Sequence, residues 1–232
     1  MTIHYHGTPI TGLAALAELA GRCFCVSYAR PEQAQRAHEL GQSVMLDNGA
    51  FSFWQQRRAG TITEAPDWSG YHAWCDRWLE RQTTWAVIPD VIDGTEEEND
   101  RLIATWPHGR RGAPVWHLHE SLDRLVALAR TWPRVCLGSS GAYAELGTRQ
   151  WHRRMEQAFN LLCPSGLPIT RLHMLRGMAQ VAGPYPFFSL DSSDVAQNHH
   201  RDGRPGERAR RWDSIQCPPR WEPREQLSIE AA

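Results

Sequence analysis

Three aspartates each stand at the end of a short apolar segment of the sequence. Asp47 closes SVMLD, Asp90 closes WAVIPD and Asp191 closes FFSLD. Carboxylates serve enzymes as general acids, general bases and nucleophiles. Taken singly, each aspartate could equally form a turn or cap a following helix. Three aspartates at the same position relative to three such segments favour one shared site over three separate turns.

Other polar residues recur at the ends of neighbouring segments. Two histidines alternate in PVWHLH, so their side chains would share one face of a strand, either lining the site or including a satisfied core histidine. The turn GSSG would let a ligand approach the backbone closely. The residues at these strand ends are His117, His119, Gly138, Ser139, His173 and Arg176. Asp93 and Asp194 are interpreted as cap or turn residues.

The elements that must position these side chains alternate along the chain. Short apolar runs predict strands, and longer patterned stretches between them predict helices. The expected strands cover residues 22–28, 43–47, 85–90, 114–119, 134–138, 171–176 and 187–191. The expected helices cover residues 31–40, 68–82, 95–106, 121–131 and 148–162. Asp67, Thr95 and Ser121 are the expected N-caps of three of these helices.

This alternation is typical of a parallel sheet, and a chain of 232 residues has the size of one barrel domain. We therefore predict an α/β fold, a (β/α)8 TIM-type barrel, with the site at the carboxyl ends of its strands. The eighth strand is either a short piece around residues 214–216, or the barrel is irregular there. Residues 1–198 are expected to form the catalytic barrel. Residues 199–232 are expected to form an arginine-rich surface loop and a C-terminal segment that packs on the barrel or extends from it.

The composition excludes several classes of protein and mechanism. The net charge of -1 argues against a protein that coats nucleic acid non-specifically. All 25 basic residues are arginine, which excludes Schiff-base and lysine-nucleophile mechanisms. The six cysteines show no paired spacing and are expected to be buried thiols. No apolar run long enough to span a bilayer and no leader-like start is present, so we expect a cytoplasmic protein without a membrane partner.

Four segments together resemble a known family. LDNGAFSFW resembles the DSGGFQ segment of the queuine and archaeosine tRNA-guanine transglycosylases, and RVCLGSSG resembles their glycine-rich GGL(x)xGE segment. RLHMLRGM is similar to their (H/Y)LxGxG segment, and FFSLDSSDVAQ to the FDSASYAL nucleophile segment of the archaeal branch. The four segments follow the order of the family and span residues 43–197. The resemblance implies an enzyme that exchanges one nucleobase for another.

The chain departs from this family in three respects. The zinc motif CxCxxC with its later histidine is absent after Asp191, where Cys217 is the one cysteine, so no metal and no other cofactor is expected. Ala50 and Ser52 stand where the first motif has glycine and glutamine. The chain is also shorter than the tRNA-modifying members. In length and in its lack of the zinc motif it resembles the compact DpdA-type enzymes of bacteria and phages, which insert 7-deazaguanine derivatives into DNA.

The resemblance implies a role for each aspartate. Asp191 would be the nucleophile that forms a covalent ester with C1′, and Asp47 the general acid/base of both half-reactions. Asp90 would accept hydrogen bonds from the N1–H and the exocyclic amine of guanine. Further contacts with the base are expected from a histidine, from backbone N–H groups and from two side chains that stack on the base or pack in the core. These residues are His117 or His119, Gly138 and Ser139, and Phe51 and Met174.

The implied partners are DNA, with tRNA as the alternative substrate, and a free 7-deazaguanine base similar to preQ0. Several arginines are placed to neutralise phosphates beside a flipped-out nucleotide, although a solvated loop is the alternative. These are Arg176, Arg201, Arg204, Arg208, Arg210 and Arg211. Two other functions stay open. One is a metal-dependent barrel hydrolase with His117, His119, His173 and Asp191 as ligands, and the other is a non-catalytic DNA-binding barrel.

Overall fold

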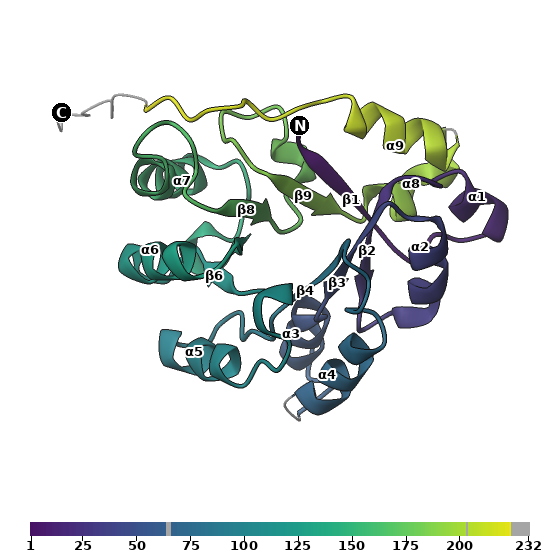
Figure 1. Cartoon of the computed structure of the whole chain (residues 1–232), viewed down its shortest axis with the longest axis horizontal. Coiled ribbons are helices and arrows are strands. Elements are labelled where there is room, and N and C mark those ends of the chain that lie inside the picture. The colour runs from purple at the N-terminus through teal and green to yellow at the C-terminus, as the bar shows by residue number, and fades with distance from the viewer. Residues whose placement is uncertain (64–65, 203, 224–232) are drawn as a thin grey trace.

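A barrel of parallel strands surrounded by helices forms the centre of the computed structural model, which describes residues 1–63, 66–202 and 204–223 (Figure 1). Neighbouring strands follow the order β5-β4-β3-β2-β1-β9-β8-β7-β6, and each pairing is parallel. The strands are β1 Ile3–Gly7, β2 Cys23–Ser27, β3 Ser43–Asp47, β4 Thr84–Val87, β5 Gly112–Ala113, β6 Val115–His117, β7 Arg134–Gly138, β8 Arg171–Met174 and β9 Ser189–Ser192. The predicted α/β class and TIM-type barrel are confirmed.

The two ends of this strand order meet at Pro114. Strand β5 pairs with β4, whereas β6 pairs with β7, and Pro114 alone separates β5 from β6. Proline has no N–H to give to a ladder, but its carbonyl oxygen accepts a bond from the N–H of Cys136 at 2.9 Å. Strands β5 and β6 are therefore two halves of one bent strand, and the nearly closed barrel has the eight strand positions of its class.

The eighth strand is β1, so the first of the two predicted alternatives, a strand at residues 214–216, is wrong. Strand β1 pairs with β2 on one side and with β9 on the other, which links the first and last parts of the chain. Its sequence, IHYHG, lacks the apolar run of a typical buried strand because His4 and His6 occupy it. The Nε2 atom of His6 donates to Asp213 Oδ1 at 2.9 Å, so a helix of the C-terminal segment satisfies this nitrogen of the buried ring, while Nδ1 has no partner among the described residues.

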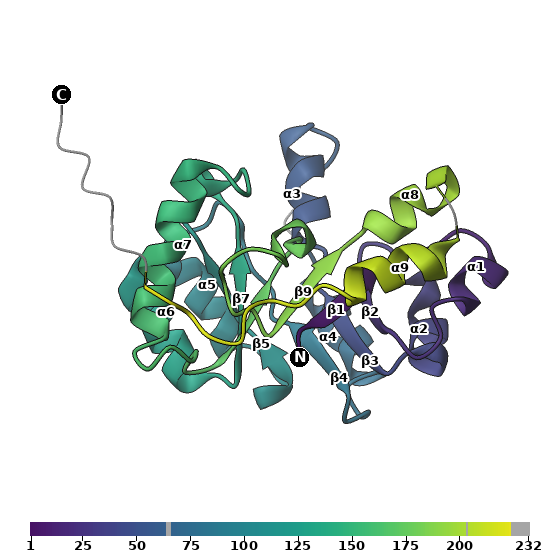
Figure 2. The same cartoon turned by 90° about the horizontal axis from the view of Figure 1, so that it is seen from above.

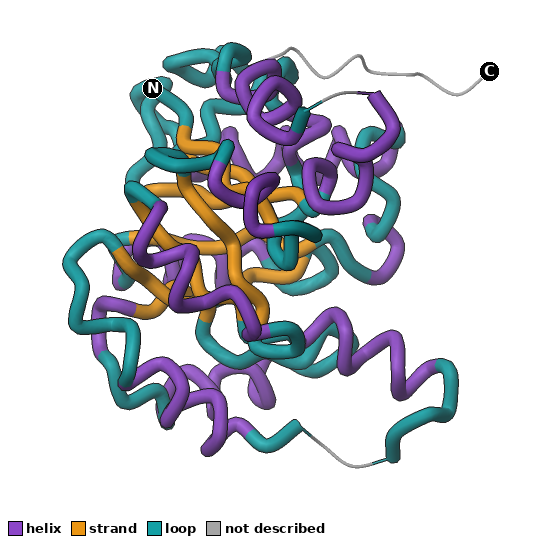
Figure 3. Tube along the Cα trace, turned by 90° about the vertical axis from the view of Figure 1, so that its right-hand side faces the viewer, coloured by secondary structure: helices purple, strands orange, loops and turns teal. Residues whose placement is uncertain are grey.

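Helices cover the outside of the barrel (Figure 3). They are α1 Leu13–Ala17, α2 Ala34–Leu40, α3 Ala50–Arg58, α4 Trp68–Asp76, α5 Glu96–Ala104, α6 Leu122–Thr131, α7 Arg149–Leu162, α8 Asp194–Asp202 and α9 Pro205–Asp213. The side chains of Asp67, Thr95 and Ser121 accept from backbone N–H groups at the starts of α4, α5 and α6, which confirms the predicted N-caps. Strand β8 is followed by the 3-10 turn Met178–Gln180. No helix within the described ranges is both long and apolar enough to span a membrane.

The arginine-rich tail is helical rather than a surface loop. Helices α8 and α9 lie beside α1 and α2, across the barrel from α5, α6 and α7 (Figure 1). The first turn of α9 is buried, because Pro205 and Gly206 pack there and Gly206 donates to the Glu18 carboxylate. The predicted boundary at residue 198 consequently falls inside α8. Residues 203 and 224–232, which belong to the predicted tail, lie outside the described part of the chain.

Asp194 joins α8 to α9. Its carboxylate accepts from Arg208 Nε at 2.6 Å, from Arg208 Nη2 at 2.8 Å and from Trp212 Nε1 at 2.8 Å. The sequence suggests a solvated segment because it is rich in charge, but part of that charge is paired across the two helices. The pairing lowers the pKa of Asp194 from its ordinary value of 3.8 to about 2.

Alternate residues of the strands form two layers of core. One face of each strand fills the barrel interior, where Tyr5, Met45, Trp85 and Cys136 pack together. The opposite face packs against the helices, as Phe24 and Leu137 do. Five of the six cysteines are buried and all six are free, which agrees with the expectation of buried thiols.

We predict that Asp194→Asn destabilises the protein in a pH-dependent manner. Because the pKa of Asp194 is lower in the folded than in the unfolded state, its charge stabilises the fold above pH of about 4, and this stabilisation disappears as the pH falls towards about 2. Urea unfolding should therefore show a deficit for the variant at pH 6 that shrinks below about pH 4. The control, Glu145→Gln at an exposed position, should show no such deficit. An equal deficit at every pH would contradict the role of the charge.

Candidate active site

A cavity of about 200 Å³ opens at the carboxyl ends of the strands. It is small beside the roughly 300 Å³ or more of pockets for drug-sized ligands, and it suits a molecule no larger than a base. All three strand-end aspartates line it, together with several other predicted site residues. The predicted residues that line it are Asp47, Asp90, Asp191, His117, Gly138, Ser139, Phe51 and Arg176.

Asp191 lies on β9, and two donors fix its carboxylate. His173 Nε2 lies 3.2 Å from Oδ1, and the backbone N–H of Arg176 donates to the same oxygen at 2.8 Å. Burial lowers the pKa of His173, so the neutral ring donates from Nε2 and accepts at Nδ1 from the Ser189 hydroxyl, 2.8 Å away. Among the described residues, no donor bonds Oδ2. The carboxylate is thus oriented through one oxygen while the other is unoccupied, as a nucleophile requires.

The turn after β8 brings Arg176 to this carboxylate. Arg176 has a φ of 53°, in the left-handed region that non-glycine residues rarely adopt. This conformation directs its N–H to Asp191 and places its guanidinium carbon 3.8 Å from the centre of the Phe51 ring. Backbone strain of this kind persists only where the surrounding structure holds it, and it often marks a functional site.

Asp47 ends β3 and lines the same cavity, and the pKa of its carboxyl group is raised there. Burial raises the pKa of its carboxyl to about 6, and the negative charges of Asp191 and Asp90 act in the same direction. The Ser27 hydroxyl and the Gly49 N–H, which is 3.1 Å from Oδ2, partly offset this rise. A carboxyl group whose pKa is close to neutral pH can both release and accept a proton, which is the property of a general acid/base.

Asp90 is buried, and one hydrogen bond holds its side chain. Asn48 Nδ2 donates to its Oδ1 at 2.7 Å, whereas His117 Nε2 lies 2.9 Å from its Oδ2 without forming a hydrogen bond. Asn48 also donates to the carbonyl of Ile88 at 2.8 Å, so it connects the ends of β3 and β4. Each carboxylate oxygen has two lone pairs, so Asp90 can still accept from a ligand. Sequence reasoning did not identify Asn48, which looks like a turn former in the motif DNGA.

The two histidines of the predicted pair have different positions. His117 lines the cavity, and its Nδ1 is buried without a hydrogen-bond partner among the described residues. Gly138 leaves space beside this atom, because a Cβ there would lie 3.0 Å from it. His119 is exposed and joins two loops: its Nδ1 lies 2.7 Å from the Ser140 hydroxyl, and its Nε2 lies 3.3 Å from the carbonyl of Gly94. His117 is therefore the histidine that a ligand can reach in this cavity.

The remaining predicted contacts lie elsewhere. Met174 is fully buried in the core between strands and helices, so the structure does not place it against a ligand in the cavity. The tail arginines do not line the cavity either. Arg208 is paired with Asp194. Arg210 lies near Arg22, whose pKa is lowered mainly by burial and further by the charge of Arg210. Arg22 precedes β2 and thus marks the opposite end of the barrel. Arg201, Arg204 and Arg211 are exposed on α8, at the start of α9 and on α9.

Helix α3, which the sequence did not predict, projects from the barrel (Figure 2). Its first turn lines the cavity, and a row of stacked groups continues along it. The Phe51 and Trp54 rings stack with centroids 5.6 Å apart, and the Arg58 guanidinium lies 4.8 Å from the Trp54 ring centre. With Arg176 over Phe51, these four side chains form what we name the α3 stack. Their spacing along the helix places Phe51, Trp54 and Arg58 on one face.

Comparison of the chain with protein-family models, curated proteins and solved structures finds no match in any of the three. The site must therefore be interpreted from its own geometry. Across residues 1–63, 66–202 and 204–223, no group of three or more His, Cys, Asp or Glu side chains is arranged to hold a metal ion. In particular, both ring nitrogens of His119 lie within hydrogen-bond distance of other protein groups, the Ser140 hydroxyl and the carbonyl of Gly94.

We predict that Asp47→Asn stabilises the fold above neutral pH. The pKa of Asp47 rises from 3.8 in the unfolded chain to about 6 in the folded protein, so the parent loses stability as the pH rises through this window. The variant carries no such charge and should gain about 1–3 kcal/mol at pH 8, with the gain vanishing below about pH 4. Urea unfolding at both pH values measures this difference. A variant less stable than the parent at pH 8 would refute the raised pKa.

Proposed function

We propose that this protein is a base-exchange transglycosylase that replaces guanine in DNA with a 7-deazaguanine derivative. The observation that carries the proposal is the pairing of Asp191 with Asp47 in one base-sized cavity. One carboxylate is oriented by two donors, and the other has a pKa raised to about 6. Exchange at a glycosidic carbon needs both a nucleophile and a group that transfers protons.

Asp191 and Asp47 can divide the reaction between them. Asp191 Oδ2 attacks C1′ as the bond from C1′ to N9 of guanine breaks, and Asp47 gives the departing base its proton. The product is an ester between Asp191 and the sugar. The incoming 7-deazaguanine then loses its N9 proton to Asp47 and attacks C1′, which releases the Asp191 carboxylate. Asp47 ends with the proton it began with, so no further reactant is required.

The cavity also supports selection of a guanine-like base. Asp90 offers the carboxylate lone pairs that the N1–H and exocyclic amine of guanine require, and adenine cannot supply both donors. His117 Nδ1 is a second polar atom that lacks a partner among the described residues. A buried group of this kind is costly unless a ligand or water satisfies it. Gly138 and Ser139 line the cavity next to His117, within reach of the same ligand.

The α3 stack supports a nucleic-acid polymer as the substrate. Enzymes that act on a base inside a strand must take it out of the stack of its neighbours. Aromatic rings and guanidinium groups next to the cavity can stack on the flanking bases, as they do in proteins that bind single strands. This surface replaces the tail arginines as the proposed contact with DNA. The preference for DNA over tRNA derives from the resemblance to the compact DNA-modifying enzymes.

Nucleoside mass spectrometry tests this function. Cells that make the protein and are supplied with a 7-deazaguanine base should contain modified deoxyguanosine in their DNA. Asp191→Asn and Asp47→Ala should abolish the modification, because each removes one of the two reacting carboxylates. Asp123→Asn, at an exposed position on α6, is the matched control and should retain it.

Three outcomes would count against the proposal. Modification found in tRNA and not in DNA would refute DNA as the substrate, although not base exchange as the reaction. Release of free guanine without incorporation of another base would indicate hydrolysis in place of exchange. Modification that persists in Asp191→Asn would exclude that residue as the nucleophile.

A further inference from the structure

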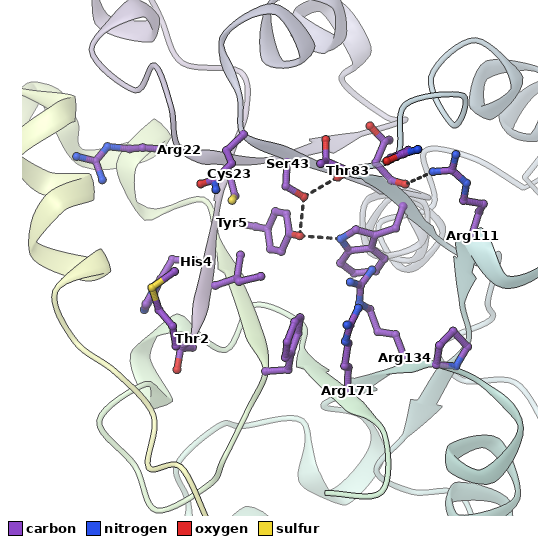
Figure 4. Close-up of a pocket in the computed structure, with 18 of the residues that line it drawn as sticks. Thr2, His4, Tyr5, Arg22, Cys23, Ser43, Thr83, Arg111, Arg134 and Arg171 are labelled. Atoms are coloured by element: carbon purple, nitrogen blue, oxygen red, sulfur yellow. Dashed lines mark hydrogen bonds between the residues drawn. The ribbon is translucent and has the colours of Figure 1, made fainter.

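A second and larger cavity, of about 580 Å³, opens at the amino ends of the strands, opposite the carboxylate site (Figure 4). Its walls come from the first residues of most strands of the barrel, among them Ile3, Cys23, Ser43 and Arg134. The volume lies in the range of pockets that bind small molecules. Barrel enzymes carry out their chemistry at the other end, so this cavity is not part of the proposed active site.

Arginine dominates the charge of this cavity. The arginines that line it are Arg22, Arg110, Arg111, Arg134 and Arg171. Asp213 is the one acidic residue among the described residues of its lining, and Arg22 and His6 already bond its carboxylate. The lining therefore carries a clear excess of positive charge, although the whole chain has a net charge of -1.

Most of the polar groups here already have partners within the protein. A chain of hydrogen bonds leads from Trp85 Nε1 to the Tyr5 hydroxyl at 2.9 Å, from there to the Ser43 hydroxyl at 2.9 Å, and on to the carbonyl of Thr83 at 2.6 Å (Figure 4). Arg111 donates to backbone carbonyls, including that of Arg81 at 2.7 Å. These groups hold the walls of the cavity and are not available to a ligand.

Among the described residues, Arg110, Arg134 and Arg171 have neither a carboxylate nor a carbonyl partner, and of these three Arg134 and Arg171 lie against aromatic rings. Their guanidinium groups alternate with aromatic rings: the Arg134 carbon lies 4.0 Å from the ring centre of Trp85 and 6.0 Å from that of Phe188. Arg171 lies 4.8 Å from the same Phe188 ring. Arg134 Nε is buried and has no hydrogen-bond partner in the described part of the chain. In Figure 4, Arg134 and Arg171 reach into the cavity from the same side.

Two like charges held together without a counter-charge destabilise each other. Burial lowers the pKa of Arg134, and the nearby charge of Arg171 acts in the same direction. An oxyanion between them would relieve the repulsion and satisfy the free N–H groups, because the planar guanidinium fork matches both carboxylate and phosphate. The aromatic rings preorganise the two forks, since stacking on rings fixes the guanidinium planes.

We propose that this cavity binds a small organic anion, whose carboxylate or phosphate group is held by the guanidinium groups of Arg134 and Arg171. The cavity has room for more than the oxyanion itself, which favours an organic molecule over a bare ion. The proposal is independent of base exchange, because it concerns the opposite end of the barrel and uses neither Asp47 nor Asp191.

Thermal unfolding at constant ionic strength tests the site, since a ligand that binds the native state raises its Tm. The probes are inorganic phosphate, glycerol 3-phosphate and acetate, each exchanged for chloride. At least one of them should raise the Tm of the parent protein and of Arg153→Gln, a control at an exposed position on α7 that lines neither cavity. Arg134→Gln and Arg171→Gln should lose most of this rise. A response to the phosphates or to acetate identifies which oxyanion the site prefers.

Two results would overturn the proposal. An equal rise in Tm for all four proteins would show a general effect of the salt. No rise in the parent with any of the three probes would show that no such site exists. Should Arg134→Gln fail to fold, Arg171→Gln decides alone, because Arg171 is exposed and its loss leaves the core intact.

Discussion

The rest of the structure depends on the closure of the parallel barrel. Strand β1 pairs with β2 and β9, and the bent strand through Pro114 links β4 to β7. This closure makes the carboxyl ends of the strands converge, so Asp47, Asp90 and Asp191 line one cavity although they are far apart in the sequence. Burial at this end of the barrel raises the pKa of Asp47, and the charges of Asp191 and Asp90 act in the same direction. The acid/base property of this residue is thus a consequence of the fold rather than of its immediate neighbours in the chain.

The interior of the barrel connects the two cavities physically. Tyr5, Trp85 and His173 pack edge to face between them, with ring centroids 5.1–5.9 Å apart. Trp85 supports Arg134 at the amino end, and His173 orients Asp191 at the carboxyl end. These three rings therefore form an aromatic column inside the barrel, and they contact polar groups at both of its openings. Such a packed column leaves little freedom for either end to rearrange alone.

Local patterns in the sequence predicted the seven strands with apolar runs, the capped helices and the three aspartates at the strand ends. These local patterns failed where a polar side chain bonds a partner that is distant in the sequence. Strand β1 was missed because His4 and His6 break its apolar run, and the Asp213 carboxylate that makes His6 acceptable lies more than 200 residues away. The composition of the tail predicts a loop, because the pairing of Asp194 with Arg208 cannot be seen in the sequence. The alternation of residues along β8 could not show that Met174 faces the helices, because the sequence does not reveal which face of the strand is turned towards the barrel interior.

If Asp191 is the nucleophile, it forms a covalent ester with the sugar, and this ester can be trapped. The protein would be incubated with a guanine-containing single-stranded oligonucleotide in the absence of an incoming base, denatured, and weighed intact by mass spectrometry. We expect an adduct with the mass of the oligonucleotide minus guanine, which disappears when a 7-deazaguanine base is added and does not form on Asp191→Asn. An adduct of equal yield on Asp191→Asn, or none on the parent protein, would contradict this role of Asp191.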